Sequence, residues 1–123
     1  METKNMTETL PDYGAKKDIE NRKLGELRKT FTRNLVLLLT FMLNKNYYPM
    51  LGRDGEKHKL YSLHFDGLAV DVILTKNDTV LTKTSDHLEF GLYWMSLDPL
   101  NCWGGDFSNP DGNHYSMSYL GKK

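Results

Sequence analysis

SLHFDGLAVDV, residues 62 to 72, introduces a predicted strand in which a carboxylate stands among apolar side chains. Alternation over residues 68–75 gives the strand two faces, Val70, Val72 and Leu74 against Ala69, Asp71 and Ile73. An unpaired carboxylate on a buried strand is unfavourable, because it loses its hydration without gaining a partner. Asp71 therefore needs a cation or several hydrogen-bond donors.

Length and composition restrict the class of protein. The chain has 123 residues, enough for one domain with a core that needs no disulfide or structural metal. Lys plus Arg and Asp plus Glu both number 16, which argues against a dedicated binder of nucleic acids or membrane surfaces. The single cysteine, Cys102, excludes an internal disulfide. We expect a monomer without a nucleic-acid partner.

Neither the N-terminus nor the most apolar run indicates a membrane segment. METKNMTETLPDYGAKK, at the start of the chain, has no apolar run of signal-peptide length. Residues 35–43 are apolar but cover only about half of the roughly 20 residues that a spanning helix needs. We expect a protein made in the cytoplasm without a signal peptide, so another component must carry it to any site of action outside.

Two segments have the apolar periodicity of helices. The first, residues 18–44, is predicted to bury one stripe, consisting of Leu24, Leu27, Phe31, Leu35, Leu38 and Met42. The second lies within residues 84–99, with Ser85 or Asp86 as its cap. Its predicted buried stripe consists of Leu88, Leu92 and Met95. His87, near the start of this helix, is predicted to lie at the surface.

The remaining segments complete an α+β pattern. Residues 1–15 form a predicted flexible polar arm, and residues 16–123 form a predicted single domain. Residues 52–62 are predicted to be a polar loop. Strands are predicted at 68–75, at 79–81 after a turn, and at 114–119. The predicted architecture is a small antiparallel sheet flanked by helices.

Two histidines could compensate Asp71. His64 precedes its strand and His114 begins the last strand, so the three side chains can converge if the strands are neighbours. Two imidazoles and one carboxylate can hold zinc with an open fourth position. Asp111, three residues before His114, could serve as a base. Other roles remain open at this point: Asp71 could bond to backbone groups, the histidines could be ordinary surface or core residues, and Asp111 could belong to the turn NPDGN.

The combined motifs resemble a known family. Ser62-x-His64-x-x-Gly67-x-Ala69-x-Asp71 is followed by Trp103-Gly104-Gly105-Asp106-Phe107 and Asp111-x-x-His114-Tyr115. This arrangement resembles zinc peptidases that cleave bacterial cell-wall peptides, namely D-alanyl-D-alanine carboxypeptidases, D-Ala-D-Ala dipeptidases and phage L-alanyl-D-glutamate endopeptidases. The resemblance covers residues 47–119. The paired motif is specific, whereas either half alone would not be.

The resemblance implies a function and a fold. His64, Asp71 and His114 would bind Zn²⁺, and Asp111 would take the place of the catalytic acidic residue. The fold would be a small α+β domain of the D-alanyl-D-alanine carboxypeptidase/hedgehog-like type. The substrate would be the peptidoglycan stem peptide, cut by a phage-derived L-Ala-D-Glu endopeptidase. Such an enzyme, an endolysin or a virion component, reaches the cell wall after release by another agent or with the virion.

The substrate-binding residues implied by the resemblance are less regular. Arg53, Ser62 and Trp103 are predicted to contact substrate or support the site, but the spacing of Arg53 to His64 differs from the common pattern. His58 could face the cleft or lie in an exposed loop. Asp106 could compete with Asp111 as the base, although its motif favours a structural role.

Two alternative functions remain. One is a D-Ala-D-Ala carboxypeptidase, which shares these motifs. The other is a non-catalytic zinc-bearing module that binds the cell wall or a partner protein. A fourth protein ligand would close the zinc site and favour the second alternative, and Cys102, twelve residues before His114, is the candidate.

Overall fold

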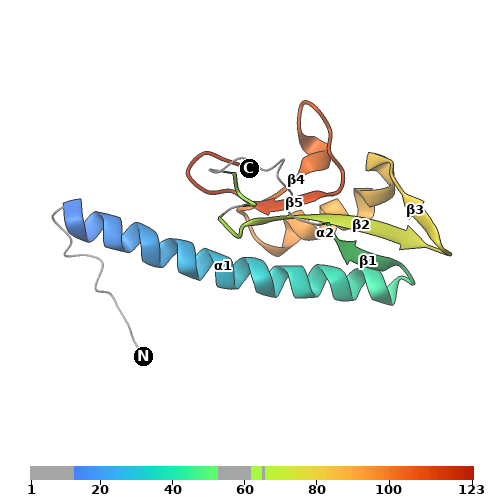
Figure 1. Ribbon diagram of the computed structural model, residues 1–123, viewed down its shortest axis with the longest axis horizontal. Coiled ribbons are helices and arrows are strands. Elements are labelled where there is room, and N and C mark those ends of the chain that lie inside the picture. Colours follow the sequence, from blue (N-terminus) through green and yellow to red (C-terminus); the bar gives the residue numbers. More distant parts are fainter. Residues whose placement is uncertain (1–12, 53–61, 65) are drawn as a thin grey trace.

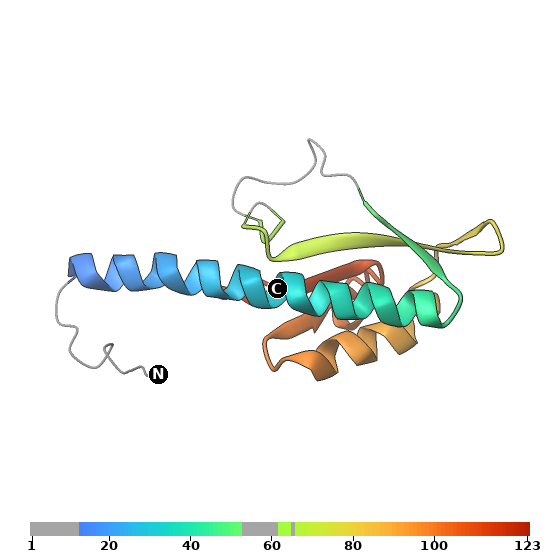
Figure 2. The same cartoon turned by 90° about the horizontal axis from the view of Figure 1, so that it is seen from below.

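The structure is a computed structural model that describes residues 13–52, 62–64 and 66–123. Figure 1 shows the long helix α1 running beside a sheet, and the shorter helix α2 lies along the C-terminal half of α1 (Figure 2). The helices and strands in chain order are α1 (Tyr13–Asn44), β1 (Tyr48–Leu51), β2 (Ala69–Lys76), β3 (Thr79–Leu81), the 3₁₀ helix η2 (Thr84–His87), α2 (Leu88–Leu97), β4 (Asn101–Trp103), the 3₁₀ helix η3 (Gly104–Asp106) and β5 (His114–Met117). Among the described residues, no helix has the length and apolar character needed to cross a membrane.

The sheet has five strands, and each pair of neighbouring strands is antiparallel. Its order is β1-β2-β5-β4, with β3 also paired to β2. The helix α2 contacts both α1 and β4, and α1 also contacts β1 and β5 (Figure 2). This arrangement confirms the predicted α+β class, and it places β2 and β5, the strands of the candidate ligands, side by side.

The core lies between the helices and the sheet. From α1, Phe31, Leu38 and Met42 are buried, which confirms the predicted stripe. On β2, Val72 and Leu74 are fully buried, as the alternation predicts. Further core residues include Leu63, Leu68, Phe90, Trp94, Trp103, Tyr115 and Met117.

The buried face of α2 differs from the predicted one. Leu88 and Leu92 are 49% and 56% exposed, whereas Phe90 and Trp94 are buried. Packing of α2 against Trp103 explains the difference, because a Cβ on Gly91 would lie 2.1 Å from the indole. Only a glycine allows this close contact, so the helix turns its aromatic side chains inward and leaves the two leucines outside.

Several boundaries also differ from prediction. The first helix begins at Tyr13, so residues 13–15 are helical although they were predicted to belong to the arm. The rest of that arm, residues 1–12, lies outside the described residues. The predicted side-chain cap of α2 is not formed, because its N-cap is His87 without a side-chain hydrogen bond, and Asp86 instead accepts the backbone N–H of Lys83 at 3.0 Å at the start of η2. The short strands β1 and β4 were not predicted.

Candidate metal centre

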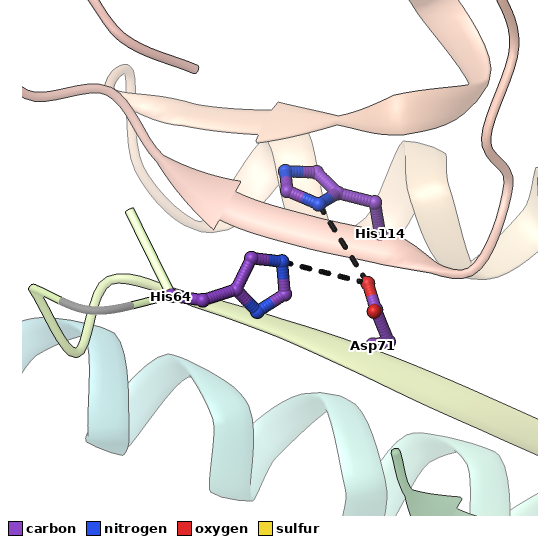
Figure 3. A group of neighbouring side chains, drawn as sticks. All are labelled: His64, Asp71 and His114. Carbon is purple, nitrogen blue, oxygen red and sulfur yellow. Dashed lines mark ion pairs between the residues drawn. The ribbon is translucent and has the colours of Figure 1, made fainter. Parts of the chain in front are cut away.

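Three side chains converge at one point of the sheet. His64 comes from the turn before β2, Asp71 from β2 itself and His114 from the start of β5 (Figure 3). Asp71 Oδ1 lies 3.7 Å from His64 Nε2 and 3.7 Å from His114 Nδ1. One potential ligand atom from each residue lies within 4.8 Å of the other two.

Strand pairing brings Asp71 and His114 together. The two residues are directly opposite in the antiparallel pair of β2 and β5. The backbone N–H of Val72 donates to the carbonyl of Asn113 at 2.8 Å. Hydrogen-bonded pairs alternate along an antiparallel ladder, so Asp71 and His114 form a non-hydrogen-bonded pair, the kind whose side chains lie closer.

A tight turn positions His64. The N–H of Leu68 donates to the carbonyl of buried Leu63 at 2.8 Å, and the N–H of Gly67 donates to the carbonyl of His64 at 3.2 Å. Gly67 has a φ of +76°, and a Cβ there would lie 2.9 Å from Arg28 Nε. Glycine is therefore required at position 67, which confirms the predicted tight turn of the backbone.

The burial of the cluster suits a metal with one open side. The side chains of His64 and His114 are 9% and 10% exposed, and that of Asp71 is 29% exposed. Phe107 covers His114, with 5.3 Å between the ring centroids. The two imidazoles are therefore largely buried, whereas Asp71 keeps part of its side chain exposed, although its Oδ1 atom next to the imidazoles is itself buried.

The donor set fits zinc. Tetrahedral ligands about 2.0–2.2 Å from zinc stand roughly 3.4 Å from one another, close to the 3.7 Å separations in this cluster. His64 Nε2 and His114 Nδ1, the ring nitrogens next to Asp71, are the atoms that would face a cation held between the three side chains. A bound cation would compensate the negative charge of Asp71. It would thus be the partner that a carboxylate on a largely buried strand requires.

Asp111 lies beside the cluster and is not part of it. Its side chain is exposed, and the three-residue group does not include it. The carbonyl of Asp111 accepts the N–H of His114 at 3.1 Å, and its own N–H donates to the carbonyl of Gly104 at 2.8 Å. Asp111 therefore occupies the turn that leads directly into a candidate ligand.

Cys102 does not join the cluster. It lies on β4 opposite Ser116, and its thiol donates to the carbonyl of Leu100 at 3.6 Å. Burial raises the pKa of this thiol, which favours the neutral form over the thiolate that metals prefer. The described cluster thus has three protein ligands and not the four of a closed site.

The predicted substrate residues have different outcomes. Trp103 is only 3% exposed and donates its indole N–H to the carbonyl of Gly112 at 2.7 Å, so it supports the loop from inside, which argues against a substrate contact. Ser62 is half-buried next to the turn of His64. Asp106 is exposed, which does not support its predicted structural role. Arg53 and His58 lie outside the described residues.

His87 is a functional candidate that the sequence did not reveal. It was predicted to be exposed, but it is 2% exposed, and its Nδ1 atom lies 2.8 Å from the hydroxyl of Tyr115. It also lines a cavity that includes Asp111. The spacing of His87 to the buried Phe90, Gly91 and Trp94 is the signal that could have identified it, because this set forms one helical face.

A substitution at Gly104 tests whether the turn at Asp111 holds His114 in position for a metal. A Cβ at this position would lie 2.1 Å from the carbonyl oxygen of Asp111 and 2.8 Å from His114 Cβ. Gly104→Ala is therefore expected to displace both residues and lower zinc affinity at least tenfold, measured by competition with a chromophoric chelator. Gly25→Ala is the matched control, because no atom lies within 4 Å of a Cβ at Gly25. Equal zinc affinities in the two variants would contradict this account of Gly104.

Comparisons with known proteins bear on the fold. Neither a protein-family model nor a curated protein sequence matches the chain. Among solved structures, it is similar to the crystal structure of the L-Ala D-Glu endopeptidase ChiX from Serratia marcescens, with a TM-score of 0.54 and 18% identity over 76% of this chain and 85% of that chain. At this identity the likeness shows a shared fold: a small α+β domain with an antiparallel sheet and two helices.

Proposed function

We propose that this chain is a zinc-dependent peptidase that cuts the L-Ala-D-Glu bond of the peptidoglycan stem peptide. The convergence of His64, Asp71 and His114 carries the proposal. The fold shared with an L-Ala D-Glu endopeptidase supports the choice of substrate. The experiments must distinguish this function from two alternatives. These are a D-Ala-D-Ala carboxypeptidase and a non-catalytic zinc-bearing module.

The three cluster residues would hold the metal. The two imidazoles supply neutral nitrogen ligands, and Asp71 supplies the negative charge that a divalent cation needs in a partly buried place. When bound, zinc would polarise the scissile carbonyl and make water a better nucleophile at neutral pH. The open side left by a three-ligand set is the feature that favours catalysis over a purely structural site.

Asp111 would move the proton. A carboxylate beside the cluster can accept a proton from the attacking water and deliver it to the leaving amine. Its exposed side chain can reach a substrate without ligating the metal, and a backbone hydrogen bond joins its residue to His114. We also propose that the protein meets the cell wall after release by another agent or as part of a virion.

The product of digestion tests the proposed bond. Purified peptidoglycan is incubated with zinc-loaded protein, and new termini are identified by mass spectrometry. New N-terminal D-Glu is expected. Released D-Ala would instead identify a carboxypeptidase, and binding of the wall without any new terminus would identify a non-catalytic module.

Metal removal provides a further prediction. Dialysis against a chelator is expected to abolish hydrolysis, because a carboxylate alone cannot supply the electrophilic assistance of a cation. One equivalent of zinc should restore it, as followed by release of free amines from the wall. Unchanged hydrolysis after complete metal removal would refute a zinc-dependent mechanism.

A further inference from the structure

His87 and Tyr115 form a buried polar pair in the core. The imidazole of His87 is 2% exposed and the phenol of Tyr115 is fully buried. His87 Nδ1 and the Tyr115 hydroxyl are 2.8 Å apart, and the ring centroids are 5.9 Å apart. Apolar residues could fill this space at lower desolvation cost, so the pair calls for a functional explanation.

The pair fixes the position of the imidazole proton. A tyrosine phenol is protonated at neutral pH and can donate one hydrogen bond. Burial also lowers the pKa of His87, an effect that Asp86 and Asp111 only partly oppose, so the imidazole is neutral. Within the described part of the chain, His87 Nδ1 is the one hydrogen-bond partner of the phenol. A phenol O–H whose partner is Nδ1 would donate to that nitrogen, and this direction would place the imidazole proton on Nε2.

His87 is also one of the residues that line a cavity. His87 lines a space of about 380 Å³, and since Nδ1 is turned to Tyr115, Nε2 lies on the opposite edge of the ring. Six of the residues around this cavity are Ile73, Leu81, Thr84, His87, Asp111 and Asn113. The loop that carries Asp111 is held against the cavity, because the N–H of Gly112 donates to Thr84 Oγ1 at 3.2 Å.

The cavity is related to the candidate metal centre through Asp111 and through chain neighbours of two ligands, although His64, Asp71 and His114 do not line it themselves. Asn113 and Asp111 lie one and three residues before His114, and Val72, which follows Asp71, lines the same cavity. The walls are apolar at Ile73 and Leu81, with a neutral donor at His87 and a carboxylate at Asp111. Such a combination suits a peptide group, which brings both an acceptor and a donor.

We infer that this cavity binds the part of the substrate that carries the leaving amine, with His87 Nε2–H donating to one of its carbonyl oxygens. The inference rests on the proposed function, because Asp111 would return the proton to the leaving amine and also lines the cavity. The carboxylates of Asp86 and Asp111, which both act on His87, make a neutral carbonyl or carboxamide a better occupant than a carboxylate.

The first part of the test locates the proton. Long-range ¹H–¹⁵N correlation spectra of zinc-loaded protein distinguish the two neutral imidazole tautomers. His87 is expected to carry its proton on Nε2, and added γ-D-Glu-L-Lys, the leaving product, should shift the His87 ring signals. A proton on Nδ1, or His87 signals that stay fixed while those of Asp111 and Asn113 move, would overturn the inference.

The second part uses the kinetics of the tripeptide L-Ala-γ-D-Glu-L-Lys. His87→Leu removes the donor and should raise KM at least tenfold with little change in kcat and unchanged zinc content. His87→Gln places an amide donor near the Nε2 position and should restore KM to within about threefold. A merely structural role would instead lower the melting temperature of both variants without this division between KM and kcat.

The outcomes separate this inference from the proposed function. If the wild-type protein hydrolyses the tripeptide while folded His87→Leu keeps the wild-type KM, the role of His87 is refuted and the peptidase function stands. If the wild-type protein binds zinc but does not hydrolyse the tripeptide or the wall, the proposed function fails, and the inference fails with it.

Discussion

Replacing His64 or His114 with alanine is expected to abolish zinc binding and wall hydrolysis together. Each imidazole would supply one of three ligands, and a ring nitrogen of each lies 3.7 Å from Asp71 Oδ1. Loss of outer-shell partners alone typically weakens metal affinity about 10–100-fold, so loss of a direct ligand should exceed about 100-fold. Metal analysis after gel filtration and competition with a chromophoric chelator measure the effect.

The matched control is another buried histidine outside the cluster. His87→Gln should keep one equivalent of zinc, because His87 belongs to the Tyr115 pair and not to the ligand group. A melting curve shows whether the alanine variants remain folded. Wild-type zinc content in folded His64→Ala and His114→Ala would exclude this cluster as the metal site.

The sequence predicted the cluster because its key distances are set locally. Period-two alternation along β2 fixes the face of Asp71, and the turn at Gly67 returns His64 toward that face. His114 required one further assumption, that the last strand pairs with β2. The register Asp71 to His114 supports that assumption. Short-range rules together with one assumed strand pairing allow the convergence, and the family resemblance names the same three residues as metal ligands.

The orientation of α2 could not be predicted in the same way. Leu88 and Leu92 have helical spacing and high hydrophobicity, yet they are exposed. The close contact between Gly91 and Trp103 turns the helix, and these residues belong to different elements. Periodicity shows that a helix has an apolar face. It does not show which of two overlapping apolar faces packs against an aromatic ring from a distant part of the chain. The same error concealed His87, which shares the buried face with Phe90 and Trp94.

The short strands had no signal of their own. The residues of β1 show no alternation of burial, and β4 has only three residues. The extended conformation of each strand depends on its pairing partner, because β1 pairs with β2 and β4 pairs with β5. Such edges acquire strand geometry from a neighbour and not from propensity.

Asp111→Asn is expected to reduce wall hydrolysis by about 10²–10⁴-fold while zinc stays bound, the usual range for loss of a general acid–base group. The substitution keeps the shape of the side chain and the backbone bonds to Gly104 and His114, so the turn should persist. It removes only the ability to take up a proton at neutral pH. Initial rates of amine release, together with zinc content and a melting curve, measure these three effects separately.

Asp106→Asn distinguishes the two neighbouring carboxylates. The side chain of Asp106 is exposed, and its residue is the last of η3, five residues before Asp111. Surface substitutions of this kind usually change stability by no more than about 0.5 kcal/mol, so near-normal rate and melting temperature are expected. Normal turnover in Asp111→Asn beside an inactive but folded Asp106→Asn would show that Asp106 is the base. Loss of activity in Asp111→Asn alone assigns the proton transfer to the residue whose backbone already holds a candidate zinc ligand in place.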